Sequence, residues 1–412
     1  MSRQRRGYDA HVVKRFYGWY MVVALALSTT VAYGVLYYSF AVFVKPMELE
    51  LGWNRAQTSG AFSLALIVAG LIAPFLGRVV DKQGARLVTS LGATLAAVTV
   101  FLWSKVSSLE MLYLTWALLG FTMTATFYDP AFTVVAVWFR AGRSKAILVI
   151  TLIAGLASTI FVPLSTFLLE HFGWRNSIAI LAGIQLLTAP MLWLVLRRHP
   201  HDLNLEPDGL PLQSQPEARM VQPLETVHFW RSSIFWSLAL GFALARMAVS
   251  VLAPHLVPLL RERGFSSVFA ATIAGLVGVL QLGGRLIFVP MTNRVTLTFL
   301  TAVTFALHGL GILLLTSSSE ISVWGFVILY GSTNGAITIA RAALTAELFP
   351  TRVYGQVSGA ISLVVALSGS LAPFGAGLLH QKTGNYQSTL WILVGLLAVS
   401  SLIVLNARDD KH

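Results

Sequence analysis

The sequence predicts an all-α membrane protein with twelve transmembrane helices in two pseudo-symmetric six-helix halves. Three observations predict this fold. Of the 412 residues, 56% are hydrophobic and 11% are charged, whereas a soluble chain has roughly 25% charged residues. The apolar residues form long continuous runs, each close to the roughly 20 residues that a membrane-spanning helix needs. The second half of the chain also repeats landmarks of the first.

The twelve apolar runs, read between charged residues and Gly- or Pro-marked breaks, are the expected helices. The first run follows a basic stretch and is longer than the apolar core of a signal peptide, so we expect the mature protein to retain it. The spans are expected at 17–44, 57–80, 86–104, 109–137, 146–169, 177–196, 233–258, 267–290, 296–316, 322–347, 355–379 and 388–407.

A polar, proline-bearing stretch separates the sixth run from the seventh. Phe139 and Pro163 before this stretch recur as Phe349 and Pro373 after it, at an offset of about 210 residues. Duplicated six-helix halves around a midplane site are a transporter architecture. The predicted division is an N-terminal half, a cytoplasmic linker and a C-terminal half, over 1–196, 197–232 and 233–412.

The basic residues indicate the orientation. With both termini cytoplasmic, 19 of the 29 Lys and Arg residues lie on the inner face and seven on the outer face, as the positive-inside rule requires. The net charge of +12 therefore reflects membrane topology, and we expect no nucleic-acid partner.

The chain has no cysteine, and it shows no metal-ligand cluster, nucleotide loop or nucleophile–base pair. We expect no metal, no cofactor and no enzymatic activity.

The loop after the second span, residues 77–86, reads GRVVDKQGAR. It resembles the signature G-x-x-x-D-[RK]-x-G-x-[RK] of the major facilitator superfamily, at the loop where that family carries it. The resemblance implies that Asp81, among Arg78 and Arg86, forms a charge cluster that locks the inner gate in one conformation. The equivalent stretch of the second half, 289–294, lacks the glycine and the acid.

Within that superfamily, the chain resembles the bacterial monocarboxylate and oxalate–formate carriers. The first span opens with FYGWY at 16–20, the seventh carries His255 between two prolines, and the eighth carries GGRL at 283–286. The resemblance implies that Arg285 binds the substrate carboxylate and that His255 lines the pocket. Animal members of the branch have an acid where this chain has Gln281 and a lysine where it has Tyr38.

Ionisable side chains at bilayer depth are costly, so by default they mark functional sites. Five such residues lie inside the expected spans: Asp129, Arg246, His255, Arg285 and Arg341. Polar residues at helical spacing accompany some of them and predict a cavity wall. These stripes are Thr122, Thr126, Asp129 and Thr133; Asn334, Thr338, Arg341 and Thr345; and, more weakly, Thr30, Tyr33 and Tyr37.

Arg285 can offer a carboxylate two parallel charge-assisted bonds; the alternative is a structural ion pair. Gln281, one turn away, can supply an amide donor or orient the arginine. Asp129 has two open interpretations, an ion pair with Arg341 or Arg246 across the halves, or a proton carrier with a raised pKa. His255 contacts substrate, shuttles a proton, or is a satisfied helix-end histidine. The predicted substrate-binding residues are Arg285, His255, Gln281, Tyr33, Tyr37, Tyr128 and Asn334. The predicted coupling or gating charges are Asp129, Arg246, Arg341, Asp81, Arg78 and Arg86.

These features predict a proton-coupled symporter of small organic monocarboxylates, of the lactate or pyruvate type, that works by alternating access. The alternative is an organic anion exchanger or an efflux carrier of a larger amphipathic acid. The expected partners are a small organic anion, a proton and the lipid bilayer. The resemblance implies a bacterial inner membrane, and we expect the protein to function as a monomer.

Overall fold

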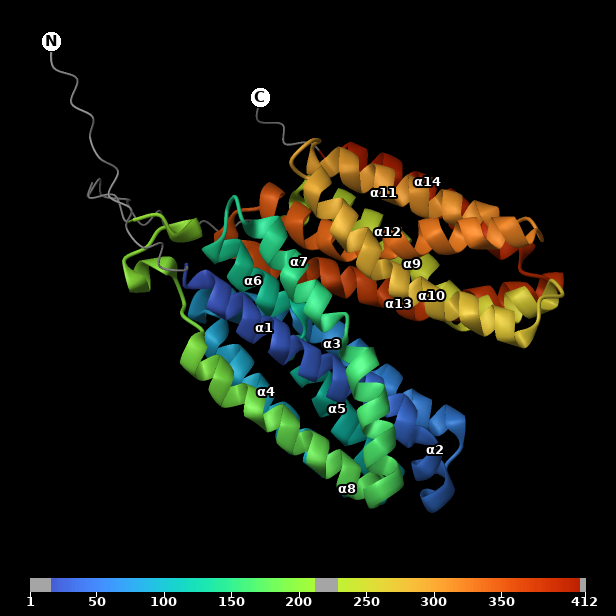
Figure 1. Ribbon diagram of the computed structural model, residues 1–412, viewed down its shortest axis with the longest axis horizontal. Helices are drawn as coiled ribbons and strands as arrows, with labels where there is room; N and C mark the ends of the chain where they lie inside the picture. The colour runs from blue at the N-terminus through green and yellow to red at the C-terminus, as the bar shows by residue number, and fades with distance from the viewer. Residues whose placement is uncertain (1–15, 212–228, 408–412) are drawn as a thin grey trace, which may run out of the picture.

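The computed structural model describes residues 16–211 and 229–407, and these ranges are built almost entirely of helices (Figure 1). The expected basic tail before residue 16, the second part of the linker and the last five residues lie outside the described residues. The N-terminal half contains α1 (Gly18–Tyr33), a π-helical turn (Gly34–Tyr38), α2 (Ser39–Leu51), α3 (Arg55–Gln83), α4 (Ala85–Trp103), α5 (Leu109–Thr126), α6 (Tyr128–Trp138), α7 (Arg143–Ala154) and α8 (Ala157–Val195).

The C-terminal half has one long helix for each expected span. These helices are α9 (Ser233–Glu262), α10 (Ser267–Met291), α11 (Leu297–Leu314), α12 (Glu320–Leu348), α13 (Tyr354–Thr383) and α14 (Gln387–Leu405). Between the halves, the described part of the linker forms short 3-10 turns at Pro200–Leu203, Pro207–Gly209 and Phe229–Arg231.

The described helices account for twelve membrane spans. Ten helical segments are long and apolar enough to cross a membrane. One of them, 143–195, is 53 residues long and reverses at Gly173, whose φ of 70° and ψ of 165° are not helical, so it supplies two spans. A further span, 109–138, is interrupted at Phe127 and therefore falls into two shorter helices. The predicted twelve-helix fold is confirmed.

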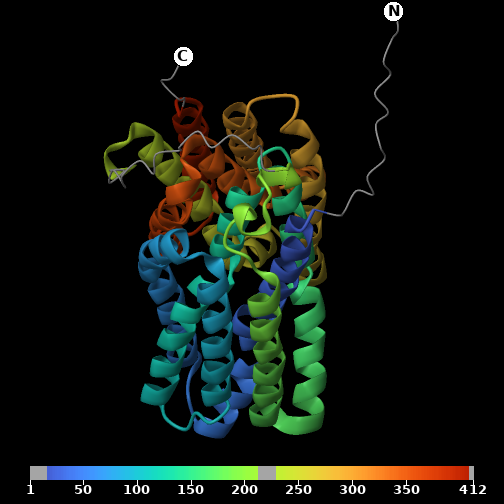
Figure 2. The same cartoon turned by 90° about the vertical axis from the view of Figure 1, so that its left-hand side faces the viewer.

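The two halves meet at one end of the molecule. We call this the terminal end, because α1 begins there and α14 ends there; the opposite end is the open end. One buried apolar cluster joins the terminal end of the N-terminal half to the C-terminal half, whereas residues towards the open end of the N-terminal half form a separate cluster. Figures 1 and 2 show the bundles together near the chain termini, and in Figure 1 they diverge away from them.

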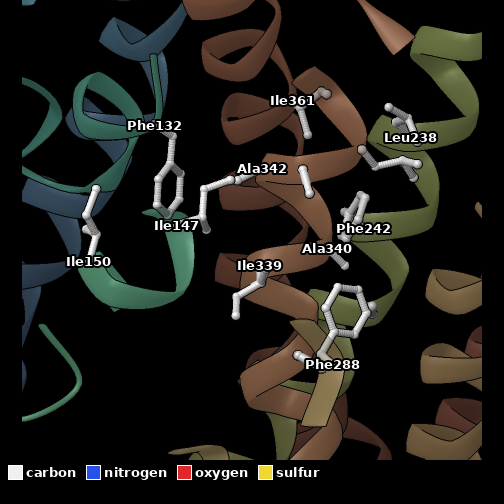
Figure 3. Packing of buried hydrophobic residues seen from close by; sticks show 14 of the residues in the cluster. Phe132, Ile147, Ile150, Leu238, Phe242, Phe288, Ile339, Ala340, Ala342 and Ile361 are labelled. Atoms are coloured by element: carbon white, nitrogen blue, oxygen red, sulfur yellow. The ribbon is translucent and has the colours of Figure 1, made fainter. Parts of the chain in front are cut away.

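The packing at the terminal end is dense. Phe132 of α6 and Ile147 of α7 lie beside α12 near Ala342 (Figure 3). On the other side of the molecule, α3 and α13 approach so closely that a β-carbon at Gly77 or Gly359 would collide with the facing backbone. Glycine permits this contact because it has no side chain. The terminal end is therefore closed by direct contact between the halves.

Candidate functional site

Arg285 lies on α10 at the contact between the halves. The side chain is only 6% exposed, and its Nη1 donates a hydrogen bond to the backbone oxygen of Thr151 on α7. Gly155 leaves room for the guanidinium, since a β-carbon there would lie 2.7 Å from Nη1. Among the described residues, Nε of Arg285 has no hydrogen-bond partner. The group therefore retains donor capacity for a carboxylate.

An aromatic wall faces Arg285 from the N-terminal half. Tyr33 stacks on Phe127 with ring centroids 4.0 Å apart and lies 4.9 Å from Tyr128. The hydroxyl groups of Tyr128 and Tyr38 lie within electrostatic range of the Arg285 guanidinium. The structure thus brings the predicted Tyr33 and Tyr128 together near Arg285. It adds Tyr38, which the sequence singled out only as a departure from animal carriers.

Tyr37 extends this wall by edge contacts with Tyr38 and Phe62, with ring centroids 5.2 Å apart in both cases. The π-helical turn over Gly34–Tyr38 changes the direction of side chains within the first span. The rings of Tyr37 and Tyr38 meet nearly perpendicular, at 79°, although they are adjacent in sequence. A regular helical projection of the sequence does not reproduce this arrangement.

A second charged centre lies where α6, α12 and α13 meet. Asp129 forms an ion pair with Arg341 at 3.4 Å, and both side chains are about a quarter exposed or less. The Asp129 carboxylate also accepts hydrogen bonds of 3.0 Å from Ser358 and Ser362, and Arg341 donates to Ser362 at 3.1 Å. Of the two arginines considered from the sequence, Arg341 is the partner. Neither serine was predicted from the sequence, although the two share one face of α13 at i, i+4 spacing.

Three predicted residues on the C-terminal half lie apart from these contacts. Gln281 and Asn334 are half-buried, and Arg246 is exposed on α9. Within 16–211 and 229–407, none of the three makes a side-chain hydrogen bond or an ion pair. Gln281 instead contributes its backbone oxygen to the close packing of α10 against Gly335 of α12. In this conformation, the side chains of these three residues therefore form no polar contact within the described ranges.

His255 is engaged towards the open end of the C-terminal half, away from Arg285. Its Nδ1 lies 3.0 Å from the Tyr386 hydroxyl, and its Nε2 lies 3.3 Å from the Pro373 carbonyl oxygen. Because a carbonyl only accepts, Nε2 carries the proton and the tyrosine donates to Nδ1. Both ring nitrogens are satisfied by α13 and the start of α14. This geometry fits the helix-end interpretation of His255 and not contact with a substrate at Arg285.

Four threonines of the predicted polar stripes do not line a cavity. Thr122, Thr126 and Thr133 are at most 4% exposed, and each hydroxyl donates to a backbone carbonyl of its own helix. Thr345 behaves in the same way. Threonine commonly satisfies its hydroxyl by bonding to the preceding turn. The predicted wet wall therefore does not include these side chains.

Asp81 joins the halves at the terminal end, but not through the expected charge cluster. Its carboxylate accepts hydrogen bonds of 2.8 Å from the backbone N–H groups of Gly355 and Gln356, at the start of α13. A carboxylate at a helix N-terminus satisfies free N–H groups and interacts favourably with the helix dipole. Among the described residues, Arg78 is exposed without an ion pair, and Arg86 bonds to the Trp193 carbonyl within the N-terminal half.

Arg143 makes a second link at the terminal end that the sequence analysis did not single out. Its guanidinium donates to the Ala346 carbonyl of α12 at 2.7 Å and to the carbonyls of Phe139 and Ala136 in its own half. A cation at the last carbonyls of helices is stabilising. The signal available in the sequence was its position four residues after Phe139, a landmark of the repeat.

Within the described ranges, His, Asp and Glu side chains form no group of three or more that could hold a metal ion. The arrangement consists of a buried arginine facing an aromatic wall, an ion pair across the halves, and a closure built from helix termini.

A family model described as the Major Facilitator Superfamily matches residues 25–373. The chain belongs to this superfamily. The protein is therefore an integral membrane transporter for a small organic solute and not an enzyme.

Several curated relatives in the superfamily carry names that include a substrate class. The chain is 25% identical to monocarboxylate transporter 12-B of Danio rerio, covering 96% of this chain and 88% of the relative. It is 27% identical to monocarboxylate transporter 12 of Rattus norvegicus, covering 95% and 85%. It is 26% identical to human monocarboxylate transporter 11, covering 95% and 83%.

Solved structures of the superfamily share the fold. A human organic anion transporter superposes with a TM-score of 0.72 at 17% identity, covering 94% of this chain and 99% of that structure. A bacterial homologue of the iron transporter ferroportin, in an outward-facing state, gives a TM-score of 0.74 at 15% identity, covering 95% and 98%.

Proposed function

We propose that the protein is a proton-coupled symporter of small organic monocarboxylates, of the lactate or pyruvate type, working by alternating access. The observation that carries the proposal is the buried Arg285, whose Nε lacks a partner among the described residues and which faces the tyrosine wall. The names of the relatives support the substrate class.

The balance of charge inside the C-terminal half supports an anionic substrate. Arg246, Arg285 and Arg341 lie within its spans, and Asp129 of the other half neutralises only Arg341. An arginine fork matches the two oxygens of a carboxylate. An organic acid that binds between the halves therefore supplies the negatively charged partner that Arg285 lacks.

The Asp129–Arg341 pair is the proposed coupling element. Moving one anion into a negative-inside cell costs about 2.3 kcal/mol per 100 mV, and a co-transported proton cancels this cost. If the halves separate at the terminal end, Asp129 leaves Arg341, Ser358 and Ser362 together. A carboxylate that loses its cation and its donors binds a proton more readily, so conformational change and protonation become linked.

We further propose that the terminal end faces the cytoplasm, with both termini inside, because the basic residues concentrate there. The described conformation is then outward-facing. The proposed domain boundaries are 1–196, 197–232 and 233–412, and the proposed location is the inner membrane of a bacterium, where the protein functions as a monomer. The resemblance of the first span to bacterial carriers supports this location.

Uptake into proteoliposomes tests the proposal. The interior is made alkaline relative to the outside, the membrane potential is clamped, and radiolabelled lactate or pyruvate is added. Accumulation is expected in the parent and at least tenfold weaker in Arg285→Gln, because the carboxylate loses charge-assisted bonds. Arg294→Gln, an exposed change beyond the end of α10, is the matched control. Equal uptake by Arg285→Gln and the parent would overturn the assignment.

Asp129→Asn tests the coupling separately. This variant is expected to lose accumulation driven by the pH gradient while still exchanging labelled for unlabelled acid. Gradient-driven accumulation equal to that of the parent would exclude Asp129 as the proton carrier.

The aromatic wall favours one second candidate, the transport or exchange of a larger amphipathic acid. Stacked rings such as Tyr33 and Phe127 offer an apolar body more surface than lactate can use. Uptake only after preloading with acid would establish exchange. Competition by aromatic acids that exceeds competition by lactate would establish the larger substrate.

A further inference from the structure

One face of α9 carries an arginine at mid-span. Arg246, Ser250, Ala253 and Val257 follow i, i+4, i+7, i+11 spacing, which places them on one side of the helix. Arg246 and Ala253 are exposed, and Ser250 and Val257 are half-buried. The stripe is therefore only partly covered by neighbouring helices.

Two contacts show that this face looks into the protein and not into lipid. The stem of Arg246 and the hydroxyl of Ser250 both lie against Gly369 of α13, where a β-carbon would be 3.0 Å from Cγ and 2.9 Å from Oγ. The Arg246 guanidinium also lies within electrostatic range of the Tyr330 hydroxyl on α12. A side chain held between α9, α12 and α13 is within the bundle. An arginine facing lipid at this depth would carry a large energetic cost.

Arg246 is available to a ligand in this conformation. Within the described residues it has no acidic partner and no hydrogen bond, whereas Arg341 is paired with Asp129. Arg285 is secluded, since it is 6% exposed and bonded to Thr151 across the halves. Arg246 is therefore the accessible cation of the three.

The depths of the two arginines differ. Arg246 is thirteen residues from the start of α9 at the terminal end, and Arg285 is six residues from the end of α10 there. At a rise of 1.5 Å per residue, Arg246 lies about 10 Å closer to the open end. A solute that enters from the open end meets Arg246 first.

We propose that Arg246 forms an outer carboxylate-docking site, which binds the organic anion before it reaches Arg285. The site consists of the Arg246 guanidinium with the Ser250 hydroxyl as a second donor, and Gly369 gives both side chains the room they occupy. The identity of the ligand rests on the proposed function. A fixed positive charge in a low-dielectric cleft raises the local concentration of anions and the rate at which they arrive.

Thiol chemistry can test this site directly because the chain has no cysteine of its own. In purified Ser250→Cys protein, the introduced thiol reports the local potential through its reaction with two methanethiosulfonate reagents, the anionic ethylsulfonate and the cationic ethyltrimethylammonium. The ratio of the two rates, normalised to a free thiol, is expected to favour the anion at least tenfold. Lactate is expected to slow both reactions by occupying the site.

Adding Arg246→Gln is expected to abolish both the charge preference and the protection by lactate, while Arg246→Lys retains the charge preference. Gly369→Ala displaces the arginine stem and lowers the preference, whereas Gly375→Ala, on the same helix with no atom within 4 Å of its β-carbon, leaves it unchanged.

Equal normalised rates for the two reagents in Ser250→Cys, or protection by lactate that persists in Arg246→Gln, would overturn the proposal. The reagent preference does not depend on transport. A parent that fails to accumulate lactate but retains the preference and the protection would therefore refute the symport proposal while leaving the docking site intact.

Discussion

Asp81 is expected to hold the terminal end closed, and its replacement should shift the balance between the two conformations. The carboxylate accepts two backbone N–H bonds of 2.8 Å from the start of α13. Hydrogen bonds to a charged group contribute about 1.5–3 kcal/mol each. After a discount for solvent screening at this partly exposed position, we expect the pair to contribute about 2 kcal/mol. Asp81→Ala should therefore favour opening of the terminal end by about 30-fold.

Spin labels at the open end measure this shift. Leu49 on α2 and Ile321 on α12 are 78% and 84% exposed, and they lie on different halves. With Leu49→Cys and Ile321→Cys in the cysteine-free chain, pulsed dipolar spectroscopy gives the distribution of distances between the halves. Asp81→Ala should increase the population with short distances, and Asp81→Asn should have a smaller effect because it keeps one acceptor oxygen.

The chain offers a matched control for the loss of a carboxylate. Asp208 in the linker accepts three backbone N–H bonds of 2.8–3.1 Å from residues 140–142, all on the side of the N-terminal half. Asp208→Ala removes similar bonds without separating the halves and should leave the distance distribution unchanged. If Asp81→Ala also leaves it unchanged, or shifts it towards longer distances, the reasoning about the helix cap is wrong.

Three further predictions concern the closure and the turns. Arg143→Ala should shift the same distance distribution towards short distances, since it removes the 2.7 Å bond to α12; an unchanged distribution would show that this link is dispensable. Gly173→Ala should lower stability by about 1–3 kcal/mol because its φ of 70° disfavours a β-carbon, measured as a lower melting temperature, with Gly183→Ala as the helical control. Gly155→Ala should weaken lactate uptake by displacing Arg285, and parental uptake would count against the seating of the guanidinium on α7.

The membrane spans could be predicted from the sequence because a helix in lipid must be both long and apolar, and composition records both properties. The break at Gly173 also left a signal, since Gly173 lies in the polar stretch between the expected spans 146–169 and 177–196. The division of the fourth span at Phe127 left a weaker signal, Pro130 in the first turn of α6, because the residues on both sides of the break are otherwise mostly apolar. Hydropathy therefore reports the spans but not the interruptions within them.

The candidate site was only partly predictable. Charges at bilayer depth need partners, so an ion pair for Asp129 could be expected, but the choice of Arg341 over Arg246 depends on how α12 and α13 pack. The partners of Asp81 and Arg143 are backbone groups, which every residue has and no pattern marks. The threonine stripes failed for a local reason, since their hydroxyls bond to their own helices.

The two sides of the link between Asp81 and α13 depend on the sequence to different degrees. One side is a single carboxylate, while the other is two main-chain N–H groups that any residue except proline supplies at positions 355 and 356. Substitutions at Gln356 preserve the donor, and most changes at Asp81 remove the acceptor, whereas a β-carbon at Gly355 would lie 2.6 Å from the Gly77 oxygen and collide with it. Natural variation or laboratory selection can therefore adjust the resting conformation of this transporter through one codon, and the preference for one side of the membrane becomes a trait that evolves in single steps.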